Sequence, residues 1–160
     1  MTGGVIQEYD VTNSRALVAC VDGQPQQVSI SELNSLVGGT CTDTNWDSSH
    51  TDSGYFGLTC NSAAERYCLN QGAAGGVIQN FNTTGNSAIV LCLSGARFVV
   101  PVSTLDGLLG TNVLDAYPWN DTWHGLYYNS AAGRYCRSKG YNAGVIQEWD
   151  GKGNSTITCF

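Results

Sequence analysis

The stretch GGVIQNFNTTGNSAIVLCL (residues 75–93) has two close relatives in the same chain, GGVIQEYDVTNSRALVACV (residues 3–21) and AGVIQEWDGKGNSTITCF (residues 143–160). Each contains Gly-Val-Ile-Gln, then turn-forming Asp, Asn, Gly and Thr residues, then an apolar run that includes a cysteine. Two β-rich runs separated by turn residues predict a β-hairpin. The chain therefore contains three copies of one hairpin.

Two related octets lie between the hairpins, NSAAERYC (residues 61–68) and NSAAGRYC (residues 129–136). Alanine, tyrosine and cysteine recur in each at the i, i+3, i+4 spacing of one helix face. We expect helices of roughly 11 residues, with Asn61 or Asn129 as N-cap and Gly72 or Gly140 as the left-handed stop.

A third strand and a short helix are expected after each of the first two hairpins. The strands are predicted at residues 28–30 and 97–102, and the helices at residues 32–37 and 104–109, with Ser31 and Ser103 as N-caps and stops at Gly38 and Gly110. Pro101 places the second of these strands at a sheet edge or a strand end.

Together these elements predict an α+β fold in a single domain, residues 1–160. Two tandem repeats of hairpin, third strand, short helix, loop and helix (residues 3–74 and 75–142) precede a third, closing hairpin (residues 143–160). We expect disulfide-stabilised antiparallel sheets covered by helices, with pseudo-two-fold character. The first hairpin is expected to pack beside the third and close its sheet.

Composition narrows the class of protein. The 160 residues are 42% hydrophobic and 12% charged, which supplies a core, and the net charge is −6 with seven basic residues. Without a basic cluster, the sequence does not favour binding to nucleic acid or to an anionic membrane. It contains no apolar run of about 18 residues, and we expect a soluble, mature, exported chain with an added starter Met1.

Seven cysteines in a small chain are typical of an oxidising, extracellular compartment. The repeat predicts two equivalent bonds, Cys68–Cys92 and Cys136–Cys159, each from an octet helix to the hairpin that follows it. Cys41 and Cys60 have no counterparts in the second repeat and are expected to pair with each other. Cys20 has no preceding octet, so it is predicted to be the free thiol. A zinc site is disfavoured because no Cys-x-x-Cys occurs.

Glutamine and arginine recur at fixed places. Gln7, Gln79 and Gln147 are identical in the three hairpins, either as buried amides that tie strands together or as repeated ligand contacts, and we favour the first reading. Arg66 and Arg134 in the octets are expected to pack along their stems and donate to backbone carbonyls. A ligand role is the alternative.

The loops before the octets contain aromatic, carboxylate, amide and histidine side chains within a few residues of one another. Flat apolar rings beside polar groups are how proteins bind sugars, although such rings also serve to cover a hydrophobic layer. The candidate ligand-binding residues are Trp46, Asp47, His50, Tyr55, Trp119, Asn120, Asp121, Trp123, His124 and Tyr127.

Calcium and catalysis receive less support. Asp43, Asn45 and Asp47 have the spacing of the first EF-hand ligands, but the glycine and the terminal glutamate are missing, so no metal site and no cofactor is predicted. Asp52 adds a carboxylate to the acid and base groups of the loops, yet no nucleophile elbow, zinc-protease motif or phosphate loop occurs. No catalytic residue is assigned.

The octet of residues 61–68 with its continuation to Gly72, and the octet of residues 129–136 with its continuation to Gly144, resemble a helix-then-hairpin repeat of exported, cysteine-containing bacterial proteins. The resemblance covers about half of the chain and implies an extracytoplasmic bacterial origin. It transfers no binding or catalytic residue.

The sequence thus predicts a secreted, lectin-like carbohydrate-binding module with two related loop sites. Its expected partner is a glycan or a cell-surface glycoconjugate, and we expect the protein to be a monomer or a dimer. The alternative is a secreted protein-interaction or toxin-like factor that acts on a host or competitor surface. A glycoside hydrolase or other hydrolase ranks third.

Overall fold

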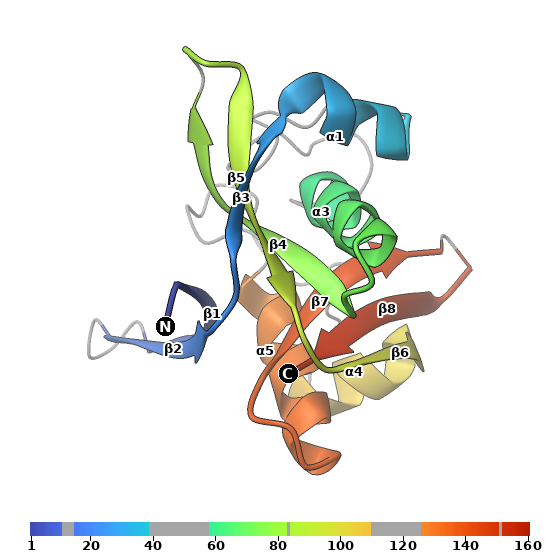
Figure 1. Cartoon of the computed structure of the whole chain (residues 1–160). Coiled ribbons are helices and arrows are strands. Elements are labelled where there is room, and N and C mark those ends of the chain that lie inside the picture. Colours follow the sequence, from blue (N-terminus) through green and yellow to red (C-terminus); the bar gives the residue numbers. More distant parts are fainter. Residues whose placement is uncertain (11–14, 39–57, 83, 110–125, 151) are drawn as a thin grey trace.

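The computed structural model describes residues 1–10, 15–38, 58–82, 84–109, 126–150 and 152–160. These residues form four helices and eight antiparallel strands, which confirms the α+β class (Figure 1). The elements in chain order are β1 (Gly3–Asp10), β2 (Arg15–Val21), β3 (Pro25–Ser29), α1 (Ile30–Val37), α3 (Leu58–Asn70), β4 (Gly75–Asn82), β5 (Ser87–Leu93), β6 (Ala96–Pro101), α4 (Val102–Leu109), α5 (Leu126–Ser138), β7 (Gly144–Trp149) and β8 (Asn154–Cys159).

The strands form three small sheets, in the orders β1-β2, β3-β5-β4 and β6-β8-β7. The first, second and third hairpins are β1-β2, β4-β5 and β7-β8. Each third strand pairs with the hairpin that follows it, as the register pairs Val28↔Ala88 and Phe98↔Ile157 show. The folded unit is therefore strand, helix, loop, helix and hairpin, out of phase with the predicted repeat boundaries. Pro101 does end an edge strand, as predicted.

The closing arrangement differs from the expectation. The first hairpin does not join the sheet of the third, because β8 pairs with β7 on one side and β6 on the other. Within the described residues β2 pairs with β1 alone.

Two kinds of helix start also differ from the prediction. The side chain of Ser29, not Ser31, caps α1 and accepts a hydrogen bond from the amide of Glu32 at 3.2 Å. The longer helices α3 and α5 begin three residues before their asparagines. Both asparagines instead bond the backbone of β7: Asn61 Nδ2 donates to the carbonyl oxygen of Ile146 at 3.2 Å, and Asn129 Oδ1 accepts from its amide at 3.4 Å.

The helix stops match the prediction where the structure describes them. Gly38, Gly72 and Gly140 have φ values of 64°, 83° and 88°, in the left-handed region that favours glycine. Gly110 lies outside the described residues.

Buried side chains form three clusters that follow the two faces of the hairpins. One cluster lies between the second hairpin and α1 and α3, and a second lies between the third hairpin and α4 and α5. A third cluster joins the opposite faces of all three hairpins, and its members are Val5, Val21, Val77, Leu91, Leu93 and Val145, with Phe160 packed against them. Every hairpin therefore shares one face with the central core, and the second and third are covered by helices on the other.

The repeated glutamine lies at a β-bulge in each hairpin, where the register shifts between Ile6 and Glu8, Ile78 and Asn80, and Ile146 and Glu148. A bulge residue leaves the strand ladder and frees its side chain for another use. All three glutamines use it in the same way, to bind the backbone at the start of a neighbouring hairpin.

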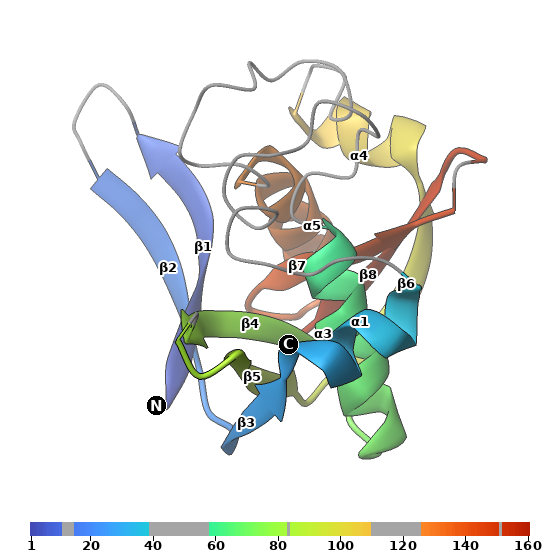
Figure 2. The ribbon, with the colours of Figure 1, turned by 90° about the horizontal axis from the view of Figure 1, so that it is seen from above.

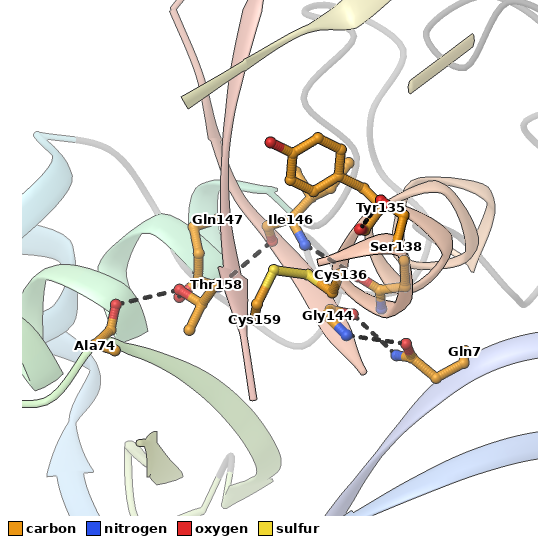
Figure 3. Close-up of a disulfide and its surroundings, with 11 residues drawn as sticks. Gln7, Ala74, Tyr135, Cys136, Ser138, Gly144, Ile146, Gln147, Thr158 and Cys159 are labelled. Atoms are coloured by element: carbon orange, nitrogen blue, oxygen red, sulfur yellow. Dashed lines mark hydrogen bonds between the residues drawn. A yellow bond between two sulfur atoms is a disulfide. The ribbon is translucent and has the colours of Figure 1, made fainter. Parts of the chain in front are cut away.

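The amide of Gln147 accepts from the backbone N–H of Gly76 at 2.8 Å and donates to its carbonyl at 3.0 Å. Gln7 makes the same pair with Gly144, at 3.1 and 2.9 Å (Figure 3). The third pair joins Gln79 to Gly4, at 3.0 and 3.2 Å.

These six hydrogen bonds close a ring in which the first hairpin binds the third, the third binds the second and the second binds the first. We call it the glutamine ring. The expected pseudo-two-fold character is therefore wrong for the centre of the molecule, because the third hairpin is a full member of a three-membered cycle. The structural reading of the glutamines is the one that the hydrogen bonds support.

Replacement of Gln147 by alanine is expected to lower the free energy of unfolding by about 2–4 kcal/mol, because it leaves two buried backbone groups of Gly76 without partners. Gln147 is 0% exposed. Gln79→Ala is the matched control and should cost about 1 kcal/mol, because its hydrogen bonds are only part-buried and water can replace it. Urea denaturation under non-reducing conditions measures both, and equal losses would contradict the difference in burial.

Candidate functional site

The predicted ligand-binding residues fall almost entirely outside the described residues, as do the calcium-like aspartates and Asn45. Nine of the ten lie in residues 39–57 and 110–125, which the structure does not describe: Trp46, Asp47, His50, Tyr55, Trp119, Asn120, Asp121, Trp123 and His124. Tyr127 belongs to helix α5, but its side chain is not described. The structure does describe the helices that flank each loop. We call each pair of flanking helices a frame: α1 and α3 for the first loop, and α4 and α5 for the second.

The two frames are built alike. In each, the octet arginine ties the longer helix to the last turn of the short helix before it. Arg66 Nη1 donates to the carbonyl of Leu36 at 2.7 Å, and Arg134 Nη1 donates to that of Leu108 at 3.0 Å. The expected donation to backbone carbonyls is thus confirmed. The span from leucine to arginine is four positions shorter in the second repeat, since the leucines are 72 positions apart (108−36) and the arginines 68 (134−66).

Each arginine also pairs with a glutamate on a neighbouring hairpin. Arg66 Nε lies 2.6 Å from Glu148 Oε1, and Arg134 Nε lies 3.1 Å from Glu8 Oε1. Arg137 adds a second contact to Glu8 at 3.0 Å. One guanidinium therefore joins three elements at each frame: the short helix, the long helix and the glutamate-bearing strand.

These contacts affect the acidity of Glu8. Burial favours its neutral form, but the hydrogen bonds and charges of Arg134 and Arg137 outweigh burial and hold the pKa of Glu8 below its ordinary value. A lowered folded-state pKa stabilises the protein above the ordinary pKa of glutamate, and this contribution is lost as the pH falls through the lowered value.

Octet serines attach the same helices to the glutamine ring. Ser62 Oγ donates to the carbonyl of Gln147 at 2.6 Å, and Ser130 Oγ donates to the carbonyl of Gln7. Both carbonyls belong to bulge residues. Each long helix therefore lies between its own hairpin and the next member of the ring.

Disulfide bonds fix each long helix to its own hairpin, as predicted. The bonds are Cys68–Cys92 and Cys136–Cys159, the second of which is shown in Figure 3. Cys60 is also disulfide-bonded, and its predicted partner, Cys41, lies outside the described residues. Cys20 is a free, exposed thiol, as predicted.

Glycine at the start of each hairpin lets the helix approach. A Cβ added at Gly76 would overlap the carbonyl oxygen of Ala64 and the sulfur of Cys68. At Gly144 it would overlap the sulfur of Cys136 and lie 2.7 Å from the carbonyl oxygen of Ala132. The glycine lets the helix come close, and the cysteine opposite it on the hairpin bonds the helix. We call this glycine–cysteine pair the docking device.

Glu65 is a buried carboxyl that the sequence reasoning missed. Its side chain is 0% exposed, Arg97 Nε lies 2.6 Å from its Oε1, and no described residue donates a hydrogen bond to its Oε2. Burial raises the pKa of Glu65 against the opposing effect of Arg97. The only difference between the octets, Glu65 against Gly133, was the available signal. The ion pair joins α3 to β6, so we assign Glu65 a structural role.

An open hollow of about 710 Å³ lies between the first hairpin, the end of α5 and the C-terminal residues. Its lining includes Leu17, Val18, Cys20, Glu8 and Arg137. In the described part of the chain, no three His, Cys, Asp or Glu side chains gather where they would hold a metal ion.

Comparison of the chain with protein-family models, with curated proteins and with solved structures finds no match. Among the described helices, none is long and apolar enough to span a membrane. A functional assignment therefore depends on the residues of this chain.

The variant Glu65→Gln is expected to raise the melting temperature at pH 7 by about 2–4 °C, because it removes a buried charge while Arg97, whose side chain is 40% exposed, stays hydrated. The folded-state pKa of Glu65 is raised, so its carboxyl costs no stability below the ordinary pKa and destabilises as the pH rises through the raised value. The gain should therefore shrink toward pH 4. Thermal melts at both pH values test this, and a variant less stable than the parent at pH 7 would show a net stabilising ion pair.

Proposed function

We propose that the protein is a secreted carbohydrate-binding module with two related sites, formed by the loops of residues 39–57 and 110–125. The observation that supports this most directly is the equivalence of the two frames. Each loop leaves a short helix and enters a long helix, and an arginine closes its base on a leucine carbonyl. The two loops, which differ in length and sequence, therefore begin and end on helices that are fixed in the same way.

Binding residues commonly lie on variable loops that a rigid scaffold holds in place. The long helices are held by a disulfide to one hairpin and by a serine and an arginine to another. Little of the binding energy is then lost to ordering the scaffold. The loop sequences supply aromatic rings beside carboxylates and amides, which is the chemistry that recognises sugars.

Two sites of modest affinity favour a multivalent target, because the second contact forms at a high effective concentration once the first is made. A polysaccharide or a glycoconjugate on a cell surface has this property. Disulfides are retained in oxidising compartments, which supports export.

Replacement of Trp46 or Trp119 by alanine is expected to lower glycan affinity at the affected site about tenfold, or about 1.4 kcal/mol, by removing a stacking surface. The double variant should lose binding to a multivalent glycan surface. Val99→Ala, at a residue 64% exposed on the edge strand β6, is the control and should bind like the parent.

A glycan array identifies the ligand, and titration of the parent and variants then gives the affinities. Two results would contradict the proposal: no glycan bound at micromolar protein, or undiminished binding by a correctly folded double variant.

A secreted protein-interaction factor is the alternative, and one observation favours it. The first hairpin exposes Leu17 and Val18 by 53% and 48%, next to the free thiol of Cys20. Binding to target-cell membranes before and after enzymatic removal of glycans separates the two functions. Binding that survives deglycosylation supports the alternative.

A further inference from the structure

The three hairpins have equivalent residues but not equivalent surroundings. The register places Val18 opposite Ile6, Val90 opposite Ile78 and Ile157 opposite Ile146. Val90 and Ile157 are 0% exposed beneath helices, whereas Val18 is 48% exposed. The first hairpin therefore has the same apolar face as the others, and among the described helices none covers Val18 on this face.

The glycine of the docking device is present on that face. Gly4 is the counterpart of Gly76 and Gly144, at which an added Cβ would overlap a helix. Among the described residues, a Cβ at Gly4 would meet its own hairpin, 3.0 Å from Cγ1 of Val18 and 3.3 Å from the carbonyl oxygen of Ala19. In the described part of the chain, no helix therefore accounts for the glycine at this position.

The cysteine of the device is present as well. Cys20 pairs with Gly4 in the register, as Cys92 pairs with Gly76 and Cys159 with Gly144. The latter two cysteines each bond a helix cysteine, and Cys20 is free and exposed. Two independent features of this face, a small residue for close approach and a thiol, thus match sites that are occupied by a helix elsewhere in the chain.

The edge of the sheet gives a third indication. In the other two sheets the second strand of the hairpin, β5 or β8, carries a third strand on its far side. Within the described residues β2 carries none, and Figure 2 shows it as the outermost strand at one side of the molecule. An unpaired edge strand is a template for addition of another strand.

We propose that the first hairpin is a docking site for a strand-and-helix segment of the same repeat carried by a separate polypeptide. The added strand pairs with the free edge of β2, and the helix lies on Gly4, Ile6 and Val18. The helix must offer small residues toward Gly4, as Ala64 and Ala132 do at the occupied sites, and a cysteine that bonds Cys20. This interaction is independent of glycan binding by the loops.

A second copy of this chain is excluded as the helix donor, because its Cys68 and Cys136 are already bonded to their own hairpins. The glutamine ring indicates what the helix would meet on its other side. Gln79 of the second hairpin binds Gly4, so the helix would lie next to Asn80, where the occupied sites have Glu8 and Glu148. The occupant therefore needs no arginine at the position of Arg66 and Arg134.

Bond formation needs no external oxidant when the donor cysteine carries a mixed disulfide with glutathione. The thiolate of Cys20 attacks the donor cysteine sulfur, a new S–S bond forms, and the old S–S bond breaks. Glutathione leaves as a thiolate and takes up the proton that Cys20 lost. The oxidation state is unchanged overall.

The experiment uses the full chain and a synthetic peptide of residues 126–142, whose only cysteine is that of position 136. A scrambled peptide with the cysteine at the same position is the control. Both are equilibrated with the protein in a glutathione buffer, and intact mass measures the mixed disulfide at Cys20. The helical sequence should give an equilibrium constant about tenfold larger than the scrambled one, because docking adds about 1.4 kcal/mol to the bond.

Gly4→Ala is the matched protein variant. Its melting temperature should change by less than about 2 °C, because the exposed Val18 side chain can move aside, but the added Cβ should remove the preference for the helical peptide. Gly144→Ala, where the helix is present, should lower the melting temperature clearly. Cys20→Ser should form no adduct.

Equal constants for the two peptides, or an unchanged preference in Gly4→Ala, would overturn the proposal. So would a Cys20–Cys20 dimer of the chain that excludes the peptide, since it would assign this face to self-association. Glycan titrations of Gly4→Ala should match the parent, so that a failure of the docking proposal is distinguishable from a failure of the loop-site proposal.

Discussion

The double hydrogen bond between a bulge glutamine and a glycine backbone is the constraint on which the remaining structure depends. A buried amide satisfies a buried N–H and a buried carbonyl at once, and its cost of desolvation is offset only if both bonds form. The requirement fixes the distance between hairpins and the side of each strand that faces inward. In the ring the three amides specify one another's positions, while the valines and leucines of the central cluster supply the apolar contact area.

Helices are added to this ring in one consistent way. A disulfide holds each long helix to its own hairpin, while a serine and an arginine bind it to the next. Because the helix contacts two hairpins of the ring, its position depends on both of them. This explains why octet residues as different as Ser130, Arg134 and Cys136 recur together: the cysteine binds the helix to its own hairpin, and the serine and arginine bind it to the next one.

The sequence predicted the α+β class, the Cys68–Cys92 and Cys136–Cys159 disulfides, the free Cys20 and the structural use of the glutamines, because internal comparison isolates positions under a shared demand. It did not predict the partner of the third strand, since residues 25–29 pair across about 60 positions and no local signal encodes that choice. Ser29 rather than Ser31 caps α1, which begins at Ile30. The two serines are two positions apart, and sequence preference does not locate a helix start to within one or two residues. The loop residues of the candidate sites lie outside the described residues, so their predicted role stays a prediction.

The offset between sequence repeat and folded unit has a consequence for synthesis. Strand β3 leaves the ribosome long before β5, its partner in the sheet, and β6 likewise precedes β8. Each sheet therefore stays incomplete until its downstream hairpin has been synthesised, and the β3-β5-β4 sheet has all of its strands before the β6-β8-β7 sheet does. An expression boundary placed between the repeats, near residue 75, would separate β3 from β5 and yield two pieces with unpaired edges.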